Sequence, residues 1–247
     1  MLAIFKREFK SYFLSPIGYI YLAAMYFFLG LYFWMIFSSG VPAVPQIIYL
    51  MSTVVLFVLP VLTMRMLSED RRQKVDQALL TAPVKLSGII LGKFWAAMAV
   101  FGIGFAPTVI FEMIVASFVD GNINVISFVY MLVGMLLYGG ALIAIGMFIS
   151  SLTESTAISA IITLIINLVF AFMSGLSSLF ENATSSTKVL QVLIEAVKIV
   201  LNAFSITEVF NRFRGEIISV VDIIYLLSFI IVFVFLSVFS LNKRRWA

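Results

Sequence analysis

The chain has 247 residues and contains no cysteine and no histidine, and these two absences exclude several classes of protein. Without cysteine there is no disulfide framework and no thiolate nucleophile, and without histidine there is no zinc site of the ordinary kind. We therefore expect no catalytic residue, no metal ligand and no cofactor bound by this chain. Disorder is excluded as well, because the chain has only 14 glycines and 6 prolines and no long polar tract.

Charge is equally scarce, since 11% of the residues are charged and 63% are hydrophobic. A soluble domain is about half apolar and about a quarter charged, so a water-soluble globule is excluded. The net charge of +4 is small and the cations lie in clusters, which argues against nucleic acid as a partner. A helix that crosses a bilayer needs about 20 apolar residues, so the length allows about five to seven such helices.

Charged and polar residues divide the apolar sequence into six segments, each long enough to cross a membrane. We expect membrane-spanning helices at residues 17–37, 47–66, 87–117, 126–150, 156–179 and 222–242. The first break contains one glycine and two prolines, which end one helix and allow another to begin. The predicted fold class is all-α, a polytopic membrane protein with six transmembrane helices in one domain over residues 1–247.

Lysine and arginine are distributed unevenly between the two sides of this predicted topology. The side with the N-terminus carries twelve of them and the opposite side carries four, namely Lys188, Lys198, Arg212 and Arg214. Because positive flanking residues stay in the cytoplasm, both termini are expected to be cytoplasmic. The composition is consistent with a multi-pass protein of a bacterial cytoplasmic (inner) membrane.

Residues 1–14 have the pattern of a helix that lies on the membrane surface. At 100° per residue, one arc of this helix collects Leu2, Phe5, Phe9, Tyr12 and Phe13. We expect this arc to lie at the acyl boundary, with the lysines and Arg7 near anionic lipid headgroups. The alternative is a tail whose cations only set the topology.

The segment 67–83 between the second and third spans is the most polar part of the chain. Ser68 is placed to cap a helix, Glu69 and Asp70 would lie at the positive end of its dipole, and Asp70 is spaced i,i+4 from Lys74. Pro83 would end the helix. The segment is predicted to be an amphipathic cytoplasmic helix, and the alternative is a solvated loop that only positions two spans.

Residues 181–220 are neither a full span nor a simple loop. Apolar residues repeat at helical spacing over 190–201, and a second short helix is expected at 206–213. Two amphipathic pieces between the last two spans predict a re-entrant or interfacial hairpin that caps the outer mouth of the protein.

Two polar residues within the spans are candidates for a translocation path. Glu112 is the only acid deep in an apolar run, where burial of a charge is expensive, although it is near enough to the outer end to reach the interface. Asn167 can also act as a structural hydrogen-bonding group between helices. Gly139, Gly140, Ala144 and Gly146 are expected to allow close helix packing.

Several stretches, in this order along the chain, resemble the permease subunit of type-2 ATP-binding-cassette (ABC) exporters: Ser15–Ile20, Leu59–Arg65, Leu79–Val84 and Ile90–Lys93. Near the C-terminus, further residues resemble the gliding-motility-associated branch of that family: Phe210, Phe213–Gly215, Asp222, Tyr225, Ser228 and Arg244–Trp246.

The resemblance implies roles for the polar segments. Residues 1–14 would be the family's connecting helix, and 67–83 would be the coupling helix that contacts an ATPase through Ser68, Glu69, Asp70, Arg71, Arg72, Val75 and Leu79. Thr153 and Glu154 would form a second, smaller cytoplasmic contact. The implied partners are two copies of an ABC ATPase, a second copy of the permease or a homologous permease, and membrane lipid.

The predicted function is that of a non-enzymatic permease subunit of an ATP-driven exporter, with ATP and magnesium bound by the separate ATPase. The segment Gly88–Lys93 is similar to a phosphate loop, but it has three residues between its glycines and Phe94 after the lysine, so it predicts no nucleotide site. One alternative is a membrane anchor of an ABC-type mechanotransmission or envelope machine with no transported substrate. Another is an ion-coupled carrier, which would need several buried charges where only Glu112 is available.

Overall fold

The computed structural model describes residues 1–40, 43–72, 86–118, 125–181, 205–215 and 219–245, with side chains described as far as 173 in the fifth of the long helices. Within these ranges all regular elements are helical, and six helices are long and apolar enough to cross a membrane. The prediction of an all-α fold with six spans is confirmed. The spans are α2 (Pro16–Ser38), α3 (Val44–Thr63), α6 (Leu86–Phe118), α7 (Val125–Leu152), α8 (Thr156–Glu181) and α11 (Val220–Arg245).

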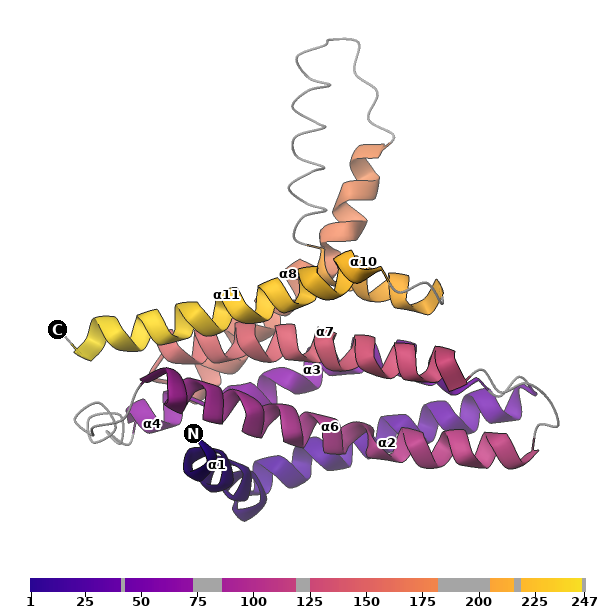
Figure 1. Cartoon of the computed structure of the whole chain (residues 1–247), viewed down its shortest axis with the longest axis horizontal. Helices are drawn as coiled ribbons and strands as arrows, with labels where there is room; N and C mark the ends of the chain where they lie inside the picture. The colour runs from indigo at the N-terminus through magenta and orange to yellow at the C-terminus, as the bar shows by residue number, and fades with distance from the viewer. Residues whose placement is uncertain (41–42, 73–85, 119–124, 182–204, 216–218, 246–247) are drawn as a thin grey trace, which may run out of the picture.

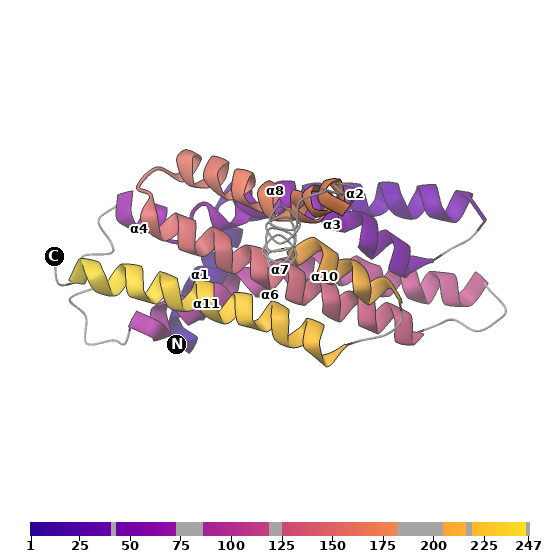
Figure 2. The same ribbon diagram turned by 90° about the horizontal axis from the view of Figure 1, so that it is seen from above.

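The shorter helices are α1 (Leu2–Leu14), α4 (Ser68–Arg72), α10 (Ile206–Arg212) and the 3₁₀ turn η1 (Phe213–Gly215). Of these, α1 and α4 lie at one end of the bundle that the spans form, and α10 lies alongside the bundle against α7 and α8 (Figure 1). α1 lies across the end of the bundle at which α4 and both termini are found (Figures 1 and 2). α10 matches the short helix predicted at 206–213, whereas the predicted helix at 190–201 lies outside the described residues.

α7 is the central helix of the bundle and packs against α3, α6, α8 and α11. Every residue from Tyr138 to Met147 is buried, as is expected of a helix that is apolar on all sides. Gly139 faces the Phe101 ring of α6 so closely that a Cβ atom at this position would overlap the ring. The predicted role of the small residues of this span in close helix packing is confirmed at Gly139 and Gly146.

The outer spans present apolar side chains to the surroundings of the bundle. On α2 the Trp34 side chain is 73% exposed, and on α11 Ile231 and Phe235 are each 66% exposed. Large exposed apolar side chains on helices of this length are typical of surfaces that contact lipid acyl chains. The buried core therefore lies around α7, and the outer faces of α2, α6, α8 and α11 carry the exposed apolar side chains.

A proline within α6 explains one contact between spans. Pro107 has no N–H group, so the carbonyl of Ile103 has no partner inside the helix. The Tyr26 hydroxyl of α2 donates a hydrogen bond of 3.1 Å to this carbonyl. An unpaired carbonyl is costly in lipid, so this bond both satisfies the backbone and joins α2 to α6.

Replacement of Gly139 tests the close packing around α7. Gly139→Ala should destabilise the protein by about 1–3 kcal/mol because its methyl group overlaps the Phe101 ring. Gly102→Ala is the matched control, since a Cβ atom at Gly102 meets no other atom within 4 Å. Thermal unfolding in detergent should show a lower midpoint for Gly139→Ala only, and equal midpoints for the two variants would contradict the packing described here.

Candidate functional site

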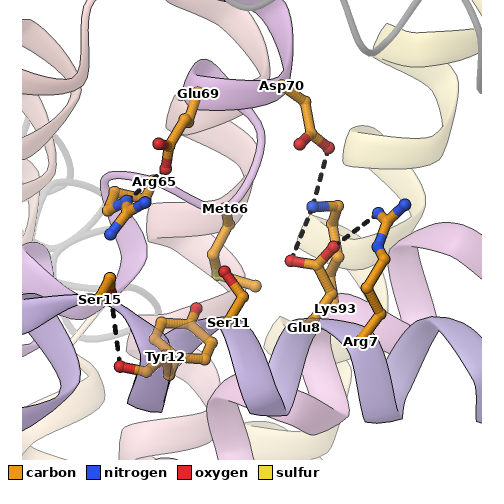
Figure 3. Close-up of a pocket in the computed structure, with 10 residues that line it drawn as sticks. All are labelled: Arg7, Glu8, Ser11, Tyr12, Ser15, Arg65, Met66, Glu69, Asp70 and Lys93. Carbon is orange, nitrogen blue, oxygen red and sulfur yellow. Dashed lines mark hydrogen bonds and ion pairs between the residues drawn. The ribbon is translucent and has the colours of Figure 1, made fainter.

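Three helices meet around one buried cation at the end of the bundle that carries α1 and α4. The Lys93 side chain of α6 is 2% exposed, and its Nζ lies 3.0 Å from Oε2 of Glu8 on α1 and 2.8 Å from Oδ2 of Asp70 on α4 (Figure 3). Arg7 adds a second cation, with its Nη2 2.7 Å from Oε1 of Glu8. One ammonium group therefore joins α1, α4 and α6.

The charges of this network stabilise one another in their ionised forms. Burial alone would raise the pKa of the Glu8 carboxyl, but the Lys93 ammonium and the Arg7 guanidinium outweigh burial and hold this pKa below its usual range. Glu8 is therefore ionised at neutral pH. Because an isolated buried ammonium would carry a large desolvation cost, Lys93 is stable in this place only with carboxylates beside it.

The corner between α1 and α2 brings Glu8 to this position. Ser15 is extended, with φ −104° and ψ 153°, as is usual for a residue before proline, and Pro16 begins α2. Gly18 lies against the Tyr12 carbonyl, where a Cβ atom would overlap it. The Tyr12 hydroxyl donates a 3.4 Å hydrogen bond to the carbonyl of Leu62, which ties α1 to α3.

The aromatic residues of α1 pack against protein. Phe5, Phe9 and Phe13 form a row of ring contacts at 5.9 and 5.1 Å, and all three are partly buried against the core. The predicted contact of the whole arc with acyl chains is therefore wrong at Tyr12, which is buried, whereas Phe5, Phe9 and Phe13 remain partly exposed. Leu2 and Leu14, at 72% and 76% exposed, are left for lipid.

Ser150 of α7 holds the bend between α3 and α4. Its hydroxyl oxygen accepts hydrogen bonds of 3.0 Å from the N–H groups of Leu67 and Ser68 and donates one of 3.2 Å to the Met64 carbonyl. The predicted capping role of Ser68 is wrong, since its own hydroxyl donates to the Met64 carbonyl and its side chain is fully buried. A serine from a distant helix does the capping because it lies beside the free N–H groups of the bend.

The two predicted cytoplasmic contacts are joined to each other. Nη2 of Arg71 on α4 lies 2.7 Å from Oε1 of Glu154, and its Nη1 donates a 3.0 Å hydrogen bond to the Leu152 carbonyl at the end of α7. Thr153, between them, donates to the Ile149 carbonyl at 3.3 Å. α4 is thus tied to the turn that leads into α8.

The remaining predicted contact residues of α4 differ in their surroundings. Glu69 pairs with Arg65 one turn earlier, whereas Arg72 is exposed and makes no ion pair with any residue in the described ranges. Val75 and Leu79 lie outside the described residues, as does Lys74, the partner expected for Asp70.

Polar cavities flank α4 on two sides. One, of about 350 Å³, lies between α1, α4 and α6 and is lined by the residues drawn in Figure 3. The other, of about 450 Å³, is lined by residues of α2, α4 and the start of α8 and by the bend before α4. Arg65 and Glu69 line both cavities. Few side chains therefore pack against α4, and its position depends mainly on the ion pairs and on Ser150.

Glu112 and Asn167, the candidates for a translocation path, lie away from this network. Glu112 is partly exposed and follows Lys93 in α6 by 19 residues, a separation of about 28 Å along a helix. Asn167 is fully buried within α8. Among the described residues there is no cluster of acidic side chains that could hold a metal ion.

Sequence reasoning missed the network of Lys93 and Glu8. Lys93 contributed to the predicted topology and to the family resemblance, but it was given no partner. The available signal was its position inside the apolar sequence of α6, where a cation needs a nearby carboxylate. Which carboxylate this would be depends on how α1 crosses α6, and a helical pattern does not contain that information.

Replacement of Lys93 tests the network. Lys93→Met leaves Glu8 and Asp70 without their shared cation, and removal of one partner from a buried ion pair costs about 3–5 kcal/mol. Because these carboxylates are 16% and 20% exposed, the loss of stability should lie at the lower end of this range. Adding Glu8→Gln and Asp70→Asn should recover part of the thermal stability. Lys243→Met is the control, since Lys243 is an exposed lysine. An unchanged unfolding midpoint for Lys93→Met would contradict the ion-pair network described here.

Comparison of the sequence with models of known protein families identifies the family of this chain. A family model described as ABC-2 type transporter matches residues 1–182, which include α1 through α8 and the whole Lys93 network. No curated protein matches the chain. With most of the chain covered by that model and six helices able to cross a membrane, this chain belongs to the ABC-2 type transporter family as a multi-pass transmembrane permease.

Proposed function

We propose that this chain is the membrane subunit of an ATP-driven exporter and works with a separate ABC ATPase that contacts α4 and the turn before α8. The observation that carries the proposal is the pair of ties on α4, from Asp70 to Lys93 and from Arg71 to Glu154. A partner that displaces α4 would act at the same time on α6, on α1 and on the start of α8.

The proposed mechanism is a shift between two conformations of the permease. An ATPase can drive such a shift only if its nucleotide states bind α4 and the neighbouring turn with unequal affinity. Asp70 and Lys93 transmit the displacement of α4 to α6, and Glu8 transmits it to α1. The two cavities beside α4 leave room for this movement.

The proposed assembly contains two permease chains, identical or homologous, and two ATPase subunits that bind ATP and magnesium. Both termini and α4 are assigned to the cytoplasmic side of a bacterial inner membrane. The distribution of twelve and four cations between the two sides supports this orientation, and both termini lie at the end of the bundle that carries α4 (Figure 1).

We also propose that the chain belongs to the gliding-motility-associated branch, on the basis of a cluster near α10. Phe210 stacks on Tyr138 at 4.9 Å, Arg212 lies 3.2 Å from Asp222, and the Arg214 guanidinium lies 4.8 Å from the centre of the Tyr49 ring. Phe210, Arg214 and Asp222 are among the residues that carry the resemblance to this branch. Their common location beside α7 supports a shared structural role.

A charge reversal at Arg72 tests the proposed ATPase contact. Arg72→Glu should reduce the amount of co-purified ATPase by about tenfold, equivalent to about 1.4 kcal/mol, because it reverses the charge of an exposed side chain within the proposed interface. The thermal midpoint of the permease alone should not change, since Arg72 is exposed and has no ion pair within the described part of the chain.

Lys243→Glu is the matched control, since it reverses an exposed cation at the same end of the bundle but on α11. It should leave the ATPase content unchanged. Equal ATPase content in Arg72→Glu and the parent protein would refute the proposed contact.

A further inference from the structure

α8 carries its polar side chains toward the interior of the bundle. Ser159, Thr163 and Asn167 follow one another at intervals of four residues, and each is fully buried. Side chains on the other faces of α8 are apolar and between 45% and 64% exposed, namely Ile158, Ile161, Ile165, Val169 and Phe172. We refer to Ser159, Thr163 and Asn167 as the polar stripe.

The polar atoms of this stripe have no hydrogen-bond partner within the described part of the chain. The Ser159 and Thr163 hydroxyls and both amide atoms of Asn167 are sealed from solvent and make no hydrogen bond. Buried serine and threonine hydroxyls on other spans behave differently, because Thr63, Thr108 and Ser237 each donate to a carbonyl of the preceding turn. The stripe therefore faces its neighbours without hydrogen bonds to its own helix.

Burial of these unpaired polar atoms carries a free-energy penalty that weakens the packing of α8 against its neighbours. A buried polar group without a partner loses its hydrogen bonds to water and gains none in return. Where water is absent the penalty is retained in full, and Asn167 carries it for a donor group and an acceptor together. A conformation in which water reaches the stripe would recover these hydrogen bonds.

The stripe is closed by direct contact with α3 and α7. Gly146 of α7 leaves the space in which the Thr63 hydroxyl and the Thr163 methyl group both lie, and a Cβ atom at Gly146 would be 3.1 Å from that methyl carbon. α8 packs against α3, α7 and α10. Separation of α8 from α3 and α7 would expose Thr163, the middle residue of the stripe.

The stripe starts close to the end of the bundle that carries α4. α8 begins at Thr156, so Ser159 lies in its first turn. Asn167 follows Ser159 by eight residues, which is a separation of about 12 Å along the helix. Glu154, which pairs with Arg71 of α4, lies immediately before α8, so a displacement of α4 would pull on the end at which the stripe begins.

We propose that α8 separates from α3 and α7 in a second conformation, and that the polar stripe then binds water that enters from the α4 end. In the first conformation α8 is packed against α3 and α7, and in the second α8 is separated from them and its polar stripe is hydrated. The idea that movement of α4 drives this opening rests on the proposed function. The existence of the two positions of α8 does not rest on it.

Thermal stability gives the first test, because removal of an unpaired buried hydroxyl should stabilise the closed state. Thr163→Val should raise the midpoint of unfolding by about 2–4 °C. Thr108→Val is the matched control, since its hydroxyl is equally buried but bonded to the Phe105 carbonyl at 2.7 Å, and it should leave the midpoint unchanged or lower it. A lower midpoint for Thr163→Val would overturn the proposal.

Thiol labelling gives the second test, and the absence of native cysteine makes single-cysteine variants straightforward. A small methanethiosulfonate reacts with a thiolate, which forms only in contact with water. In lipid nanodiscs, Thr163→Cys should react slowly but measurably, and Ile165→Cys, whose position is 53% exposed on the lipid-facing surface, should not react. Adding Asn167→Leu should slow the reaction of Thr163→Cys by about tenfold, because it favours the closed state.

An ATP-dependent arm separates this proposal from the proposed function. In the complex with the ATPase, ATP should accelerate labelling of Thr163→Cys. If Asn167→Leu slows labelling but ATP has no effect, the two positions of α8 stand and the coupling to α4 fails. If Thr163→Cys never reacts faster than Ile165→Cys, the proposal is refuted.

Discussion

The ion pairs of Lys93 hold together the end of the bundle on which the proposed function depends. A single ammonium, 2% exposed, lies within 3.0 Å of a carboxylate from α1 and of another from α4. The hydrogen bonds within a short helix do not hold it against its neighbours. α4 has only five residues, and α1 lies across the bundle instead of running along a span. The charge of Lys93 cannot be left alone in this apolar setting, so α1 and α4 are both held on α6.

Much of the fold follows from the sequence because a membrane imposes a simple rule. Backbone groups in lipid must be hydrogen-bonded, which favours continuous helices, and charges are costly unless they lie near helix ends or are paired. The six spans therefore begin and end near the predicted residues, as α6 over Leu86–Phe118 illustrates. Gly139 was also identified correctly, because small residues on a fully apolar helix indicate close neighbours.

The site was less predictable because its contacts join residues far apart in the chain. Helical spacing does not identify Lys93 as a partner of Asp70, and the capping of the bend comes from Ser150 rather than Ser68. Periodicity identifies the aromatic face of α1 without revealing that Tyr12 is buried. In each case the deciding factor is how helices cross, which is a property of tertiary packing. In the described residues, α4 carries ion pairs and α8 carries the polar stripe, with Arg71 and Glu154 between them.

The central claim, that Lys93 holds α1 and α4 on α6, is tested most directly by the distance between α1 and α4. Nitroxide labels can be attached to Lys10→Cys on α1 and Arg72→Cys on α4, both exposed positions in a chain without native cysteine. Electron paramagnetic resonance of the doubly labelled chain in nanodiscs should give a narrow distance distribution, and Lys93→Met should broaden it markedly. An unchanged narrow distribution in Lys93→Met would show that the two helices are held by other contacts, and would contradict the claim.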